Sequence, residues 1–148
     1  MKLKIRCIGH GNSDLLQQEF LKQQKRISSP FSLEMQIFPH SKSKNITTQK
    51  KEEADLLQKN IPSNAYLIAT AINGSNFSTE QLYDLACKHH DIILFIGGCN
   101  GLDSDLIAKC HKTWSLSNLT LTHSMVRLII AEQWYRINCI YRNHPYHK

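Results

Sequence analysis

The sequence DIILFIGGCNG, residues 91–101, joins an apolar run to a glycine-rich turn. An uninterrupted apolar run of this length is typical of a strand that is buried on both faces of a sheet. Gly97 and Gly98 follow it directly and carry no side chains, so another backbone or a ligand can approach closely there. Open parallel sheets bind ligands at this carboxyl end of their strands. The stretch predicts a parallel sheet with a binding site at Gly97.

One alternative to a binding site is a tight turn that holds no ligand. The glycine spacing is not that of the dinucleotide-binding fingerprint GxGxxG, and no acidic residue follows at the distance at which that fold binds a ribose. A nicotinamide-dependent oxidoreductase is therefore excluded, while a site for another ligand stays open.

Strands and helices alternate along the rest of the chain. Further strands are expected at residues 2–8, 31–37 and 65–72, and helices at 14–26, 49–59, about 79–89 and 124–141, with a short helix capped by Asp103. Asn73-Gly74 predicts a turn, and Ser78 with Gln81 has the spacing of a capping box. This order predicts an α/β fold, a parallel sheet flanked by helices, in a single domain of residues 1–148.

The last expected helix is unusually apolar. Apolar residues occupy 12 of the 18 positions from 124 to 141 and are spread around nearly the whole circumference. One neighbouring sheet covers only one stripe of a helix. We therefore expect a second subunit to cover the remainder, which predicts a homodimer.

The charge of the chain is positive and uneven. Its 18 Lys and Arg against 12 Asp and Glu give a net charge of +6, and most of the basic residues lie in the first half. The densest basic segment, PHSKSKNITTQKK at residues 39–51, contains no acid. Its lysines, Lys42, Lys44, Lys50 and Lys51, suit a phosphate backbone. A solvated loop without a partner is the alternative.

Several classes of protein are excluded by composition. The first residues alternate Lys2, Lys4 and Arg6 with apolar residues, and no later run approaches the ~20 apolar residues that span a bilayer. We therefore expect a cytoplasmic protein with no membrane segment. Five cysteines without a CxxC pair predict reduced thiols and no disulfides. Cys99, Cys110 and His111 match no zinc-ligand spacing, so no metal is expected.

Two further segments near the carboxyl end are distinctive. WSLSNLTL, residues 114–121, alternates small hydroxyl residues with leucines and by itself predicts an edge strand. The last six residues, NHPYHK, concentrate an aromatic ring, two imidazoles and a cation where a disordered terminus is the simpler expectation.

Taken together, IGGCNGL, WSLSNLTLTHSMVRLIIAEQWYR and NHPYHK resemble the family of ribosomal large-subunit (23S rRNA) pseudouridine N3-methyltransferases, which belongs to the SPOUT class. The resemblance extends along the chain in size and element order and is dense over about residues 94–148. It implies an α/β fold whose carboxyl-terminal part forms a deep trefoil knot, a homodimer, and S-adenosylmethionine as methyl donor. Topology rules would have excluded a knot.

The resemblance also assigns residues to the methyl-donor site. In the family the cofactor lies among three loops and is contacted largely by backbone. The positions that match here are Thr70, Gly97, Leu116, Ser117, Asn118, Leu119, Thr120 and Leu121. Two departures are visible, because Thr70-Ala71 stands where a leucine and an acidic residue are usual, and Thr122 replaces a proline. The missing carboxylate at Ala71 puts any role of that side chain in doubt.

The implied reaction is methylation of N3 of a pseudouridine in helix 69 of 23S rRNA within the assembled ribosome. The proton on N3 must leave, and imidazoles titrate near neutral pH, so Tyr146 and His147 are assigned to catalysis. RNA contacts are assigned to Lys42, Lys44, His123, Arg127, Arg142 and Lys148. Glu132 and Arg136, four residues apart on a helix, are expected to pair with each other. Two alternatives are a SPOUT enzyme acting on tRNA, against which the HPYHK ending argues, and a catalytically idle ribosome-binding factor.

Overall fold

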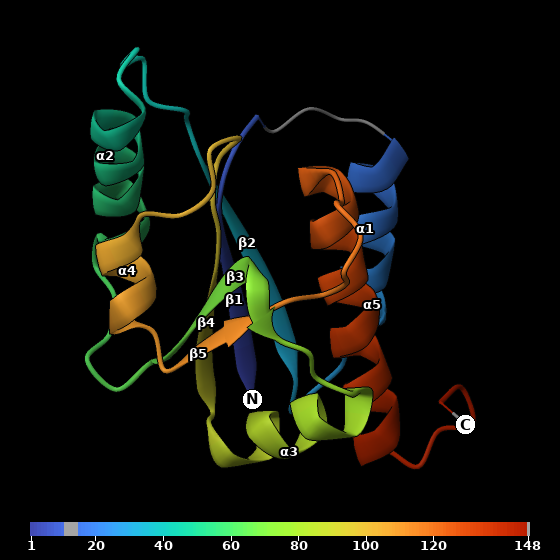
Figure 1. Ribbon diagram of the computed structural model, residues 1–148. Coiled ribbons are helices and arrows are strands. Elements are labelled where there is room, and N and C mark those ends of the chain that lie inside the picture. The colour runs from blue at the N-terminus through green and yellow to red at the C-terminus, as the bar shows by residue number, and fades with distance from the viewer. Residues whose placement is uncertain (11–14, 148) are drawn as a thin grey trace.

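A computed structural model of the protein describes residues 1–10 and 15–147. Its centre is a five-stranded parallel sheet in the order β2-β1-β4-β3-β5 (Figure 1). The strands are β1 Lys2–Ile8, β2 Ser32–Phe38, β3 Tyr66–Ser75, β4 Asp91–Ile96 and β5 Lys112–Trp114. The helices are α1 Leu15–Arg26, α2 Ile46–Gln58, α3 Thr79–Lys88, α4 Ser104–Lys109 and α5 His123–Tyr141. The predicted α/β class and the parallel sheet flanked by helices are confirmed.

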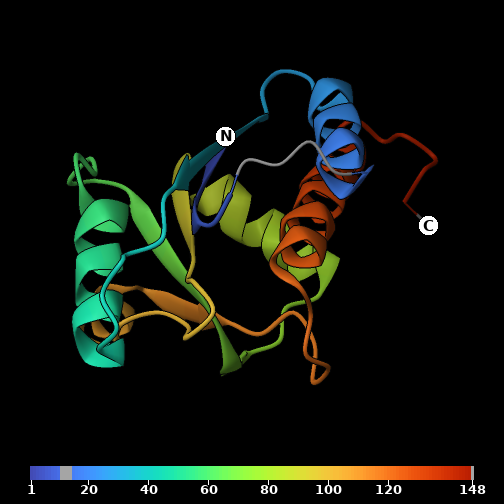
Figure 2. The ribbon, with the colours of Figure 1, turned by 90° about the horizontal axis from the view of Figure 1, so that it is seen from above.

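Helices cover both faces of the sheet, because alternate residues of each strand point to opposite sides (Figures 1 and 2). On one side, Leu3 and Ile5 of β1 pack with Phe20 of α1, Leu82 of α3 and Ile130 of α5. On the other side, a second cluster joins the sheet to α2 and α4. It contains Ile8, Ala54, Leu57, Ala65, Ala69, Ile93, Phe95, Leu102 and Leu106.

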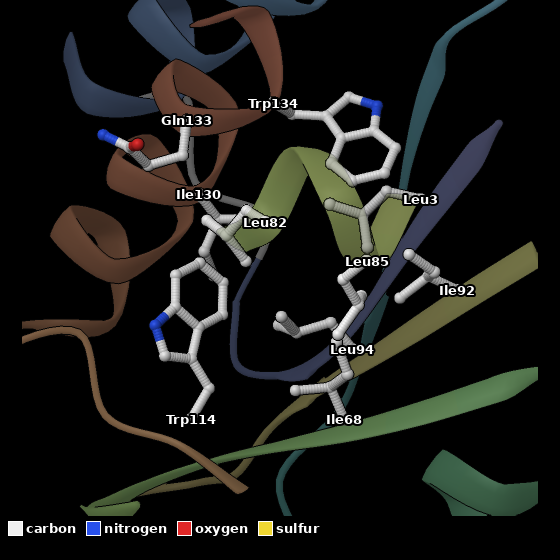
Figure 3. Close-up of a pocket in the computed structure, with 10 residues that line it drawn as sticks. All are labelled: Leu3, Ile68, Leu82, Leu85, Ile92, Leu94, Trp114, Ile130, Gln133 and Trp134. Atoms are coloured by element: carbon white, nitrogen blue, oxygen red, sulfur yellow. The ribbon is translucent and has the colours of Figure 1, made fainter. Parts of the chain in front are cut away.

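The larger core is closely packed. Figure 3 shows a small crevice in it, between the sheet and α3 and α5, with Trp114 and Trp134 among the lining residues. Its volume of about 10 Å³ is at the lower limit for a single water molecule, and its walls are apolar. This crevice is therefore part of the packing and not a ligand site.

The expected strands occur, with one difference in β3. The chain stays in strand conformation through Ser75, so the turn predicted at Asn73-Gly74 is wrong. Instead the pairing with β5 breaks, and Trp114 is aligned first with Thr70 and then with Ser75. Gly74 lies against β5 so closely that a Cβ atom there would be 2.7 Å from the backbone nitrogen of Ser115. The glycine serves a close contact between chain segments and not a turn.

Replacing Gly74 with valine is expected to lower the free energy of unfolding by about 1–3 kcal/mol, the usual cost of overpacking. The added atoms would meet backbone of residues 113–115, which has no side-chain freedom to yield. Chemical denaturation measures the change. Asn73→Ala is the matched control, because the Asn73 side chain is exposed. Equal stability of Gly74→Val and wild type would show that the two segments are not in contact.

The helices begin where side chains cap them. The Ser78 hydroxyl accepts a hydrogen bond from the Gln81 backbone N–H, and the Gln81 side-chain oxygen accepts one from the Ser78 backbone N–H, which confirms the capping box of α3. Asp103 caps α4 as predicted. Helix α2 begins at Ile46, three residues before the predicted start, because Asn45 caps it. Lys50 and Lys51 are therefore helical, and only residues 39–45 of the basic segment form a loop.

Helix α5 is covered within the same chain more completely than its composition suggested. Helix α1 packs along it, and buried Asn138 exchanges hydrogen bonds with Ser28, just beyond α1, at 3.0 and 3.2 Å. Trp134 Nε1 donates to the Ser32 carbonyl at 3.0 Å. Helix α1 thus covers part of the circumference that the sheet leaves open and for which we expected a second subunit. The homodimer stays a prediction.

Candidate functional site

The carboxyl ends of β4, β3 and β5 meet at one edge of the sheet, because these strands are neighbours and run parallel. Gly97 follows β4, Thr70 lies in β3 where pairing with β5 breaks, and residues 115–121 follow β5. The Thr70 hydroxyl donates to the Phe95 carbonyl of β4 at 2.9 Å. The fold thus brings to one edge the three segments to which the sequence assigns a common site.

The glycine turn after β4 is tightly closed. The Gly101 N–H donates to the Gly98 carbonyl at 2.9 Å, and Gly101 has a φ of +77°, which favours glycine. A Cβ atom on Gly97 would be 2.5 Å from the carbonyl carbon of Gly101 and 2.7 Å from the Leu102 nitrogen. Gly97 is therefore needed for the close packing of its own turn. Gly97 and Gly98 are buried, and the exposed residues of the turn are Cys99, Asn100 and Gly101.

The segment after β5 is a loop and not a longer edge strand, so that simpler prediction is wrong beyond Trp114. The Ser115 hydroxyl donates to the Ser117 carbonyl at 3.1 Å, and the Leu119 N–H donates to the Ser117 hydroxyl at 2.9 Å. Asn76 anchors the loop to the end of β3 by donating to the Ser115 carbonyl at 2.9 Å. The small hydroxyl residues thus shape the loop.

Within this loop the leucines differ in their surroundings. Leu116 packs against the larger core, and Leu121 is half-buried. Leu119 is 75% exposed, and its neighbours Asn118 and Thr120 are also exposed. The tip of the loop therefore offers apolar surface to a ligand.

A buried carboxylate lies beneath the glycine turn. Glu53 of α2 is 3% exposed, and a Cβ atom on Gly98 would be 2.6 Å from its Oε2. Its Oε1 accepts from the Ser41 N–H at 3.2 Å and lies 3.5 Å from His40 Nδ1. The sequence reasoning missed this group. The signal was the helical spacing of Glu53 with Ala54 and Leu57, which places the carboxylate on the buried face of α2.

His123 and Arg127 lie at the start of α5, near this carboxylate. The Thr122 hydroxyl caps the helix by accepting from the Met125 N–H at 3.4 Å. Thr122, which stands where the family has a proline, therefore serves as the cap of α5. Burial lowers the pKa of His123, the charges of Arg127 and His40 lower it further, and Glu53 opposes them. Within the described part of the chain, His123 Nδ1 is buried without a hydrogen-bond partner.

Arg127 is turned toward its own helix. Its Nε donates to the His123 carbonyl at 3.3 Å and its Nη2 to the Ser124 hydroxyl at 3.2 Å. Arg142 caps the end of α5 and donates to the Ser28 hydroxyl at 2.7 Å. Lys42 and Lys44 are exposed in the loop before α2, and Lys148 lies outside the described residues.

The carboxyl-terminal tail folds back on α5. The Tyr146 hydroxyl donates to Glu132 Oε1 at 3.0 Å, and its ring meets the Tyr135 ring edge-on at 5.0 Å. The guanidinium carbons of Arg26 and Arg136 lie 5.1 and 5.0 Å from the centre of the Tyr146 ring. Arg136 also pairs with Glu132 at 2.9 Å, which confirms the predicted helix pair.

His147 contacts the first turn of α3. Its Nε2 lies 3.0 Å from Glu80 Oε1, and its Nδ1 is buried without a partner among the described residues. The Ser78 hydroxyl, the Glu80 backbone amide and His147 together lower the pKa of Glu80 to about 2, so this carboxylate is charged. Sequence reasoning had no signal for this contact, because the two residues are 67 positions apart.

The tail and the glycine turn lie at different ends of the molecule. In Figure 1 the turn after β4 is at the top, whereas the tail lies at the lower right beside the end of α5. The structure therefore gathers Thr70, Gly97 and residues 116–121 at one edge but does not bring Tyr146 and His147 to them within one chain.

Two further properties concern the residues that the structure describes. None of the helices there is long and apolar enough to cross a membrane. Among the same residues, no group of three or more His, Cys, Asp or Glu side chains is arranged to hold a metal ion.

The parallel α/β sheet, its glycine turn and the loop beside it are the features of a methyltransferase of the SPOUT class. The family model described as "Predicted SPOUT methyltransferase" matches residues 1–147, and the chain belongs to this family. Over its whole length it is similar to proteins named ribosomal RNA large subunit methyltransferase H. It is 37% identical to that of Saccharophagus degradans and 34% identical to that of Marinomonas sp., with 100% of each chain covered. The resemblance found in the sequence motifs is confirmed at the level of the family.

Proposed function

We propose that the protein methylates N3 of a pseudouridine in helix 69 of 23S rRNA, within the assembled ribosome, with S-adenosylmethionine as methyl donor. The observation that carries the proposal is similarity along the entire chain to relatives named as large-subunit ribosomal RNA methyltransferases. The glycine turn and the loop of residues 116–121 support it, because they lie together at the sheet edge.

The residues at this edge fit the methyl donor. Gly97 places no side chain at the end of β4, while exposed Leu119 and half-buried Leu121 give apolar surface to an adenosyl group. Backbone amides and carbonyls of Ser117, Asn118 and Thr120 are suited to read the adenine edge. When bound, S-adenosylmethionine supplies the sulfonium methyl group. Thr70 uses its hydroxyl to join β3 to β4, and Ala71 offers no carboxylate.

The arrangement of the tail supports a homodimer. The carboxyl-terminal tail lies away from the cofactor edge of its own chain (Figure 1), with Tyr146 on Glu132 and His147 on Glu80, so a second copy must bring its tail there for the two to act together. We also propose that the carboxyl-terminal part forms the deep trefoil knot of the family. The close contact of Gly74 with residues 113–115 supports this, because a knotted chain requires segments to pass tightly against one another.

His147 is proposed to accept the N3 proton and Tyr146 to hold the base. The Glu80 carboxylate next to Nε2 favours the tautomer with its proton on Nε2, which leaves a lone pair on Nδ1. Nδ1 is buried in the single chain, so it can accept the proton only after the tail is displaced from α3. The Tyr146 ring, between cationic side chains, is suited to stack on a base. Alignment of the nucleophile with the methyl group then supplies much of the rate.

RNA contacts are proposed for Lys42, Lys44, His123, Arg127, Arg142 and Lys148. Lys42 and Lys44 are exposed on a loop that is held in shape by its serines: the Ser43 N–H donates to the Ser41 hydroxyl at 3.0 Å. His123 and Arg127 lie at the cofactor edge, where a target nucleotide would approach.

Replacing Lys42, Lys44, Lys50 and Lys51 with glutamine is expected to weaken binding to ribosomes and to flatten its dependence on salt. Each lost phosphate contact reduces the slope of log K against log[salt] by about 0.7–0.9. Sedimentation of the variant with ribosomes at several KCl concentrations measures the slope, with S-adenosylmethionine affinity as the control that stays unchanged. An unaltered slope would show that these lysines do not contact RNA phosphates and that the segment is a solvated surface.

The direct test is mass spectrometry of 23S rRNA from cells with and without the protein. We expect N3-methylpseudouridine to disappear in its absence, and its persistence would reject the proposed reaction. A methyl mark lost from tRNA instead would favour a tRNA-modifying SPOUT enzyme. Calorimetry that finds no binding of S-adenosylmethionine would favour an idle ribosome-binding factor.

A further inference from the structure

A groove lies away from the cofactor edge, between α3 and the amino ends of β3 and β5. It has a volume of about 350 Å³ and is open to the surface. Its lining residues are Tyr66, Gln81, Asp84, Leu85, Lys88, His89 and Lys112. None of these residues belongs to the methyl-donor site or the tail.

The wall of the groove contains a stack of rings. The Tyr66 ring stacks on the His89 ring at 3.8 Å between centroids and on the His111 ring at 4.6 Å. The Leu67 N–H donates to His111 Nδ1 at 2.9 Å, so Nδ1 holds a lone pair and the proton of the imidazole is on Nε2. Exposed His111 therefore offers an N–H donor beside the groove.

The rim of the groove is cationic. Lys88 ends α3 and Lys112 begins β5, and both side chains are exposed. They belong to two segments, residues 88–90 and 109–112, that are apart in the sequence and that the Tyr66 stack brings together. Each segment adds further basic groups, and Asp84 is the acid in the lining. Two ammonium groups and imidazole donors on one open surface are suited to a phosphate-bearing partner.

Helix α3 links this groove to the tail. His147 contacts Glu80 in the first turn of α3, and the groove begins at the next residue, Gln81. From Glu80 to Lys88 the helix rises by about 12 Å. A nucleic-acid strand held by the tail would therefore reach Lys88 after about 12 Å along the helix, once it has passed Asp84. A single phosphate ion is too small to contact both the tail and the groove, so the connection between them favours a nucleic-acid strand.

We propose that the groove binds the phosphate backbone of RNA nucleotides next to the one that the tail holds. The proposal rests on the proposed action on ribosomal RNA and names the surface that grips the flanking strand. Lys88 and Lys112 contact phosphate oxygens, His111 donates through Nε2, and the stacked Tyr66 and His89 keep the groove open.

The test is the double variant Lys88→Gln with Lys112→Gln, measured by sedimentation with ribosomes across KCl concentrations. Two lost phosphate contacts are expected to reduce the salt slope by roughly 1.4–1.8. The Lys88→Arg, Lys112→Arg variant is expected to keep the wild-type slope. Lys2→Gln with Lys4→Gln is the matched control, because it removes equal charge from lysines that pair with Glu34. An unchanged slope in the glutamine variant of the groove overturns the proposal.

His111→Asn provides a second, independent variant. The asparagine oxygen can still accept from the Leu67 N–H, whereas its shorter side chain has no donor at the position of Nε2, so affinity is expected to fall about 3- to 10-fold with the fold intact. Unchanged affinity would remove His111 from the proposal. Methylation of the same ribosomes is followed in parallel. A wild-type protein that binds through the groove without methylating would reject the proposed reaction and leave the groove in place.

Discussion

Gly97→Val is expected to abolish detectable binding of S-adenosylmethionine at concentrations that saturate the wild type. A Cβ atom on this residue would be 2.5 Å from the carbonyl carbon of Gly101, so the turn must open to admit any side chain. Overpacking of this kind costs about 1–3 kcal/mol, which alone weakens binding roughly 5- to 150-fold if the strain falls on the site. Displacement of the turn toward the ligand adds to that loss. Calorimetry measures binding, and thermal unfolding reports the strain on the fold.

Gly9→Ala is the matched control for this variant. Gly9 follows β1 at the same edge of the sheet, and a Cβ atom there meets nothing within 4 Å among the described residues. Its φ of +158° strains any side chain, so thermal unfolding of this variant is measured beside binding and reports a strain that involves no packing clash. We expect this variant to bind the methyl donor as the wild type does. Wild-type binding by Gly97→Val would place the methyl-donor site away from the glycine turn.

Deletion of residues 144–148 is expected to remove methyl transfer while the fold persists. In the described part of the chain, the tail makes contacts at the surface, such as Tyr146 with Glu132 and His147 with Glu80. Their loss is expected to change the free energy of unfolding by less than about 1 kcal/mol. Single-turnover methylation of ribosomes measures the rate, with calorimetry of S-adenosylmethionine as the control. A truncated enzyme that reacts at the full-length rate would exclude the tail from the mechanism.

His147→Ala separates two roles of the tail. If His147 accepts the N3 proton, its loss is expected to cost on the order of 10²- to 10⁴-fold in rate, and higher pH is expected to restore part of it because hydroxide then takes the proton. If His147 only positions the nucleotide, raising the pH restores nothing. Glu80→Gln tests the tautomer argument, since it removes the charge next to Nε2 and leaves a side chain of the same size.

The local features of the fold were predictable because they depend on neighbours in the sequence. The apolar run before Gly97 becomes strand β4, and Ser78, Gln81 and Asp103 cap the helices as their spacing indicated. One prediction failed because it used local composition alone. Asn73-Gly74 has the composition of a turn, but Gly74 lies against the neighbouring strand β5, a contact that no pattern in residues 65–75 reveals.

The candidate site also has a part that was predictable from the sequence and a part that was not. The glycine turn at the end of a parallel strand was predictable, because a buried strand and the glycines after it are visible in a short stretch of sequence. The three resembling motifs named the family that the full-length comparison confirms. The contacts between residues that are distant in the sequence came from the tertiary structure alone. Glu53 lies beneath Gly98, Glu80 contacts His147, and the rings of His89 and His111 stack on Tyr66. These contacts join residues that are between 23 and 67 positions apart, and chain folding alone brings such residues together.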